Sequence, residues 1–191
     1  VPRKPAKMHA FSSEAFAGSQ RTFGTSGFGG FELKKWALDG TATAYQTRGS
    51  KQIDPAVRGS VDGYAGVRYT SFLTRIGHKI GDNSSIFVRP SYFGEVRTNG
   101  TGLQTNRSHI RGLSAGGTLH ADDSFKVEIR AFGGTQVYDQ TFSAVNAART
   151  TENLIRKQRV PSQNIGGSVV LSGSLGIHSL VGGIDLRQVR G

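Results

Sequence analysis

The chain has 191 residues, with 24 Lys and Arg against 13 Asp and Glu, and a formal charge of +11. It contains no cysteine, which excludes disulfide frameworks, Cys-ligated zinc, iron–sulfur clusters and thiol catalysis. Hydrophobic residues make up 36% of the chain, too many for a disordered tail. No apolar run approaches the roughly 18 residues of a membrane-spanning helix. The composition predicts a folded domain of ordinary size without helical membrane spans.

Alternating apolar and polar residues recur along the chain, a pattern typical of strands with two chemically different faces. The clearest case runs from Phe125 to Asp139, where Val127 and Ile129 lie opposite Lys126 and Glu128. We expect residues 1–16 to be irregular and residues 17–191 to form one domain. The predicted strands are nine: 17–25, 29–38, 41–48, 61–79, 84–97, 108–120, 124–142, 163–172 and 175–190.

Short polar turns alternate with long connections between these strands. The predicted tight turns are Asp39-Gly40, Gly81-Asp82-Asn83, Ala121-Asp122-Asp123 and Gly173-Ser174. The predicted long connections are Arg48 to Ser60, Thr98 to Arg107 and Ser143 to Ser162. This rhythm places all tight turns at one end of the sheet, as in bacterial outer-membrane barrels.

We therefore expect an all-β fold, an antiparallel up-and-down sector of a transmembrane β-barrel. Nine strands leave the first and last parallel, so we expect the barrel to be incomplete. The residues expected to face lipid are Val88, Tyr92, Val127, Ile129, Val169, Leu180 and Ile184. The residues expected to line a polar lumen are Arg89, Arg97, Lys126 and Arg130 with Glu95, Glu128 and Asp185.

Several segments resemble the barrel of TonB-dependent outer-membrane receptors. They are Arg58 to Asp62, Arg89-Pro90, Glu95 to Thr101, Arg149 to Glu152, Gln158 to Ser162 and His178 to Arg187. The resemblance runs from about Gly18 to the end of the chain. It implies a fragment of a receptor of the bacterial outer membrane that takes up a scarce nutrient, such as a ferric siderophore.

Receptors of this family hold an N-terminal plug inside a barrel of about 22 strands, and an inner-membrane complex supplies their energy. This chain matches the first part of such a barrel, and none of its residues matches the plug. The partners that the resemblance implies are outer-membrane lipid, lipopolysaccharide, a transported ligand such as a metal chelate, and the energy-coupling complex through the missing plug.

Ligand contacts in such a receptor are expected at the long-loop end and in the upper lumen. Cations and amides there suit an anionic chelate, because charge-assisted hydrogen bonds are roughly twice as strong as neutral ones. The candidate ligand-binding residues are Arg97, Asn99, Gln104, Asn106, Arg107, Gln136, Tyr138, Gln140, Arg149, Arg156 and Arg159.

Other chemistries lack support in the sequence. The string from Gly112 to Gly116 fits a hydrolase nucleophile elbow, but alternation continues through it to Leu119, which favours a strand. The histidines do not have metal-ligand spacing, and the basic residues are spread over strands and loops, which argues against nucleic acid. We expect no enzyme activity, catalytic residue, metal or cofactor. The alternative function is a soluble or surface-attached β-sandwich that binds carbohydrate or protein through its long loops.

Another pattern lies in the segment Asn146 to Ser162, which carries an excess of basic residues. Thr150 or Thr151 is suited to cap a short helix in which Glu152 and Arg156 would pair at i, i+4. We expect this segment to be an external loop.

Overall fold

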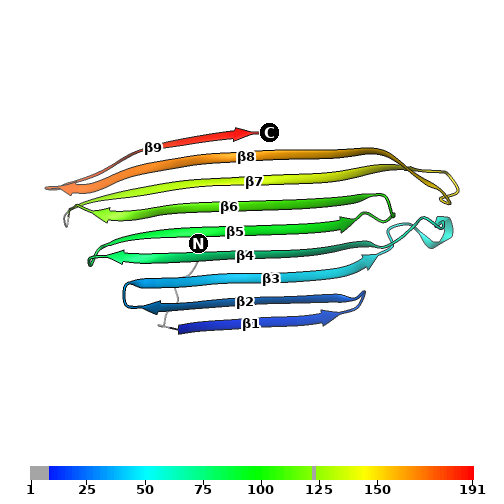
Figure 1. The fold of residues 1–191 in the computed structure, drawn as a ribbon, viewed down its shortest axis with the longest axis horizontal. Helices are drawn as coiled ribbons and strands as arrows, with labels where there is room; N and C mark the ends of the chain where they lie inside the picture. The colour runs from blue at the N-terminus through cyan, green and yellow to red at the C-terminus, as the bar shows by residue number, and fades with distance from the viewer. Residues whose placement is uncertain (1–8, 122–123) are drawn as a thin grey trace.

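The computed structural model describes residues 9–121 and 124–191. They form one nine-stranded antiparallel sheet in which each strand pairs with the next along the chain (Figure 1). The strands are β1 (His9–Gly18), β2 (Thr22–Leu33), β3 (Trp36–Ser50), β4 (Ala65–Ile80), β5 (Ser84–Thr98), β6 (Thr105–His120), β7 (Phe125–Val145), β8 (Glu152–Leu175) and β9 (His178–Arg190). The prediction of an antiparallel up-and-down sheet of long strands is confirmed.

The sheet is open. Strands β1 and β9 lie at its two edges and do not pair with each other (Figure 1). The connections β2–β3, β4–β5, β6–β7 and β8–β9 all lie at one end, which we call the turn end. The other connections lie at the opposite end, the loop end. From β3 onward, the connections therefore alternate between the two ends as predicted, although their lengths differ less than expected.

The first three strands differ from the prediction. Residues 9–16, expected to be irregular, belong to β1, while residues 1–8 lie outside the described part of the chain. The predicted turn at Asp39-Gly40 is wrong, because Gly40 sits within β3 and pairs with Gly29 and Thr74. The actual turns have Gln20, Arg21 and Lys34 in the left-handed region, with φ of 58°, 53° and 53°. Gln, Arg and Lys seldom adopt a positive φ, so the sequence does not indicate turns at these positions.

The predicted long connection from Ser143 to Ser162 is also wrong. β7 continues to Val145 and β8 already begins at Glu152, so only a short loop separates them. The predicted helix after Thr150 is absent, and Arg156 pairs with Phe142 in the sheet instead. The turn expected at Gly173-Ser174 is displaced toward the C-terminus, where Gly176 has a φ of 60°. In the predicted turn at 121–123, residues 122 and 123 lie outside the described residues.

The register gives the sheet two different faces, because paired residues share a face and neighbours along a strand alternate. We call one of them the apolar face. Its residues include a row across five strands, formed by Ile86, Gly117, Ile129, Val169 and Ile184. All the residues expected to face lipid lie there. The other, the polar face, holds all seven of the charged residues expected to line a lumen.

No hydrophobic side chain of the described residues is buried, so this single layer has no core. On the apolar face Ile129 is 42% and Ile184 69% exposed. No helix in the described residues is long and apolar enough to cross a membrane. The string from Gly112 to Gly116 lies inside β6, as predicted.

Candidate ligand-binding surface at the loop end

Three connections meet at the loop end: residues 51–64 between β3 and β4, 99–104 between β5 and β6, and 146–151 between β7 and β8 (Figure 1). Backbone hydrogen bonds join them. The amide of Gly63 donates to the carbonyl of Gly100 at 2.7 Å, and the amide of Val61 donates to the carbonyl of Arg149 at 3.2 Å. Segments distant in sequence thus form one continuous surface.

An ion pair between Asp62 and Arg149 lies at the centre of this surface. Arg149 Nη2 donates to Asp62 Oδ1 at 2.5 Å and its Nε donates to Oδ2 at 2.7 Å, a bidentate geometry. Asp62 is only 4% exposed, and it also accepts the amide of Gly59 at 2.9 Å. The hydrogen bond from Arg149, above all, lowers the pKa of Asp62 from 3.8 to about 2.

Gly59 is needed for this close approach. A Cβ at that position would overlap the carbonyl of Arg149. Arg149 itself has a φ of 55°, in the left-handed region where non-glycine residues are uncommon. The backbone conformation at Gly59 in one loop and at Arg149 in the other therefore keeps the Arg149 guanidinium next to Asp62.

Glu152, the first residue of β8, connects the loop at residues 99–104 to the hairpin of β7 and β8. Its Oε1 accepts the hydroxyls of Thr101 at 2.5 Å and Ser143 at 2.6 Å, and its Oε2 accepts the amide of Leu103 at 3.0 Å. Thr101 is buried and forms an isolated bridge with Asp62. We call the four residues Asp62, Thr101, Arg149 and Glu152 the loop clasp.

Next to the clasp, several predicted ligand-binding residues lie together on the polar face. Pairing places Arg97, Asn106 and Gln140 in one row across β5, β6 and β7. Gln136 and Tyr138 continue this face along β7. We call these five residues the loop-end polar patch.

Arg97 in this patch is held by a neighbouring carboxylate. Its Nε and Nη2 donate to the two carboxylate oxygens of Glu95 at 2.7 and 2.8 Å. Asn99 Nδ2 donates to Asn106 Oδ1 at 3.2 Å, and the amide of Asn99 donates to the carbonyl of Gln104 at 2.9 Å. Hydrogen bonds with neighbouring residues thus hold Arg97 and Asn106 of the patch in place.

The remaining predicted residues lie elsewhere. Arg107 and Arg159 lie on the apolar face, where Asp139 pairs with both in register and accepts a hydrogen bond from Arg159 Nη1 at 3.2 Å. Arg149 belongs to the clasp, and Arg156 lies on the polar face farther along β8.

Sequence reasoning missed the buried partners of Arg149 and Glu152. Asp62 is 87 residues from Arg149, and Thr101 is 51 residues from Glu152. Hydrogen bonds between loops so far apart in sequence leave no local signal in residue spacing.

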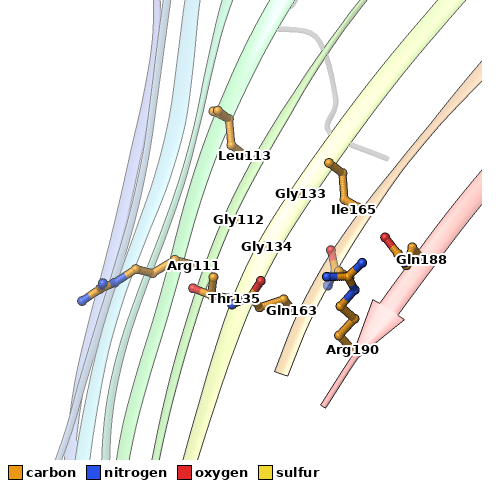
Figure 2. Close-up of a pocket in the computed structure, with 11 residues that line it drawn as sticks. Arg111, Gly112, Leu113, Gly133, Gly134, Thr135, Gln163, Ile165, Gln188 and Arg190 are labelled. Carbon is orange, nitrogen blue, oxygen red and sulfur yellow. The ribbon is translucent and has the colours of Figure 1, made fainter. Parts of the chain in front are cut away.

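A hollow of about 530 Å³ lies between β6 and β9. Figure 2 shows that Gly112, Gly133 and Gly134 leave open backbone between Leu113 and Ile165. Arg111 and Arg190 lie at one end of it, and their guanidinium groups point in different directions (Figure 2). The hollow lies where these glycines have no side chains.

The described residues contain no group of three or more His, Cys, Asp or Glu that could hold a metal ion. No protein-family model matches the chain, and no curated protein matches it either. The arrangement of faces and loops is therefore the basis for any functional assignment.

Proposed function

We propose that the chain forms part of the wall of an outer-membrane β-barrel, in a receptor of the TonB-dependent type that takes up a scarce nutrient such as a ferric chelate. The observation that carries this proposal is the uncovered apolar face. A face of this kind requires an apolar partner, and nothing in the described residues covers it.

The distribution of charge on the apolar face supports a lipid partner. The charged residues of this face gather toward the loop end, among them Arg68, Arg107, Arg111, Asp139, Arg159 and Arg190. Between them and the turn end, the paired strands carry no Lys, Arg, Asp or Glu on this face. This is the pattern of strands that cross a bilayer and project beyond it on the loop side.

The charge-free stretches of two strands have the length that a bilayer requires. On the apolar face, this stretch runs from Val127 to Val137 in β7 and from Thr70 to Ile80 in β4, whereas in β6 it covers only Leu113 to Leu119, because Arg111 lies at the level of Thr135. Ten residues of strand rise about 33 Å. A tilt of about 40° from the barrel axis reduces this to about 25 Å, the height of the apolar band in outer-membrane barrels.

Aromatic residues border the band. Trp36 and His78 contact each other with tilted rings near the turn end, with centroids 4.3 Å apart, and Phe72 and Tyr92 stack at 5.6 Å closer to the loop end. Aromatic side chains with polar atoms favour the two interfaces of a membrane, where one side is apolar and the other wet.

The polar face suits a lumen because its charges pair with one another. Arg75 lies 3.8 Å from Asp39, and Lys126 lies 3.0 Å from Glu128. The loop clasp then closes the outer rim, and the loop-end polar patch lies directly below it, where an entering ligand arrives first. This placement supports ligand capture by Arg97 and its neighbouring amides.

The test is folding of the full chain with and without lipid. We expect circular dichroism to report β-structure in lipid vesicles and aggregation or loss of structure in plain buffer. A monomeric β-fold in buffer would contradict the proposal and favour the sandwich alternative.

The receptor class has a separate test in the adjoining coding sequence. An upstream plug and downstream strands are expected there. Their absence would remove the receptor assignment while leaving the membrane assignment intact.

A further inference from the structure

Three arginines surround one phenylalanine on the polar face, away from the loop-end polar patch. The Cζ atoms of Arg75, Arg89 and Arg130 lie 5.4, 5.3 and 5.8 Å from the centroid of the Phe87 ring. The arginines come from β4, β5 and β7, so the sheet brings them together from distant parts of the sequence. We call these four residues the arginine cluster.

Glycines make this convergence possible. Phe87 pairs with Gly77 on one side and Gly116 on the other. The Arg75 guanidinium lies over Gly77, where a Cβ would stand 3.6 Å from Nη1. The Phe87 ring leans over Gly116, where a Cβ would stand 3.2 Å from Cε1. At Gly116 a Cβ would crowd the ring and would overlap the carbonyl of Ile129, whereas at Gly77 it would only reach ordinary van der Waals contact with the guanidinium.

The cluster has more positive charge than its carboxylates neutralise. Asp39 lies 3.8 Å from Arg75, and Glu128 lies 3.7 Å from Arg130 but only 3.0 Å from Lys126. Both contacts with the cluster are loose, so Arg75 and Arg130 keep donors free for a second acceptor.

Arg89 differs from the other two. It has no carboxylate within ion-pair distance in the part of the chain that the structure describes, and its buried Nε meets no acceptor there. Register places it directly across from Arg75, since β4 and β5 keep one alignment on both sides of this pair. Two like charges in adjacent strands repel each other, and an anion between them would relieve that repulsion.

We propose that the arginine cluster is a binding site for solutes that carry a phosphate or carboxylate group. The planar guanidinium offers paired N–H donors that match both kinds of oxyanion. Phe87 holds the guanidinium groups by cation–π attraction and offers its ring to the organic part of a solute. The inference rests on the proposed function, in which this face lines a lumen.

The first test uses the wild-type chain folded in lipid nanodiscs. The Nε–Hε signals of Arg75, Arg89 and Arg130 are followed by NMR during titration with inorganic phosphate, with citrate and with glucose. We expect saturable shifts with at least one of the two anions and none with glucose. A response to only one anion identifies the preferred group, whereas no response to either overturns the proposal.

The second test compares two charge-removing variants. Arg89→Gln removes the unpaired cation, and Arg187→Gln removes an arginine of the same face on β9, four strands away. Loss of a charge-assisted contact predicts that Arg89→Gln raises the Kd for the responding anion about tenfold or more. Arg187→Gln should change it less than about twofold, because interactions at that distance are screened.

Equal Kd values for the two variants would show non-specific attraction and overturn the site. If Arg89→Gln does not fold, Arg89→Lys replaces it, because this variant keeps the charge but loses the planar fork of donors. The wild-type titration still decides whether the cluster binds an anion. The two proposals fail separately. A chain that does not enter lipid contradicts the barrel wall, whereas one that enters lipid but gives no anion response contradicts only the arginine cluster.

Discussion

The side chains on the two faces of this sheet differ in how they are partnered. On the polar face, charged side chains pair with one another and rings contact across strands, as in the row Phe16, Tyr45, Tyr69 and Phe93, where centroids lie 6.2, 5.3 and 6.0 Å apart. The apolar face has large side chains in the same register, and no residue of the part of the chain that the structure describes covers them. One face is suited to water and the other requires an apolar environment. This difference between the faces supports the proposed membrane location more specifically than the fold class does.

The largest effect is expected from a charge placed on the apolar face. Ile129→Arg should lower the free energy of unfolding in lipid vesicles by about 2–4 kcal/mol, because Arg is costly at the middle of the bilayer. Gln136→Arg puts the same residue on the polar face of the same strand and should have little effect. Denaturant titration of both variants in vesicles measures the difference, and equal values would contradict the assignment of faces.

An intermediate effect is expected from the aromatic row of the polar face. Tyr45 contacts both Phe16 and Tyr69. Since each aromatic pair contributes about 0.5–1.5 kcal/mol, Tyr45→Ala should lower the free energy of unfolding by about 1–3 kcal/mol. Thr43→Ala, on the same face of β3, is the control and should change it little. If Tyr45→Ala leaves the free energy of unfolding unchanged, the aromatic row does not stabilise β1 to β5.

A local effect is expected from the loop clasp. Asp62→Asn removes the charge that holds Arg149 and should accelerate amide hydrogen exchange at Gly59 and Val61, whose amides depend on this contact. Exchange in the middle of β7 should stay unchanged. Asp185→Asn on the exposed strand β9 provides the control. Uniform acceleration throughout the sheet would contradict a local role.

The smallest effect is the pH dependence of the same contact. The folded pKa of Asp62 is about 2, below the ordinary 3.8, because Arg149 donates to its charged form. Stability from the clasp is therefore complete above about pH 4 and is lost as pH falls toward 2. NMR titration of the Asp62 carboxyl carbon should give a midpoint near 2. A midpoint near 3.8 would mean that the ion pair does not form.

Much of the sheet is predictable from the sequence because alternation is a local signal. β4 to β7 follow the expected strands closely at their turn ends, where one face is apolar and the other charged. The first half of β8, from Glu152 to Ser162, mixes polar and apolar residues on both faces and shows no alternation, so the sequence predicts a loop there.

The candidate site is less predictable, because its contacts join separate loops. Arg97 and its neighbours on β5 to β7 were expected because they end adjacent strands at the loop end. Asp62 and Thr101 were not expected, since their partners Arg149 and Glu152 come from a segment distant in the sequence. The positive φ of Arg149 makes the site still harder to predict, because arginine rarely adopts this conformation.

The environment of Trp36 tests the central claim most directly. It is the only tryptophan in the chain, and it lies on the apolar face with 54% of its surface exposed. In vesicles of lipids brominated near the headgroup, we expect blue-shifted emission, strong quenching by the bromolipid and little quenching by aqueous iodide. Strong iodide quenching without bromolipid quenching, in a sample that retains its β-structure, would contradict a lipid-facing apolar face.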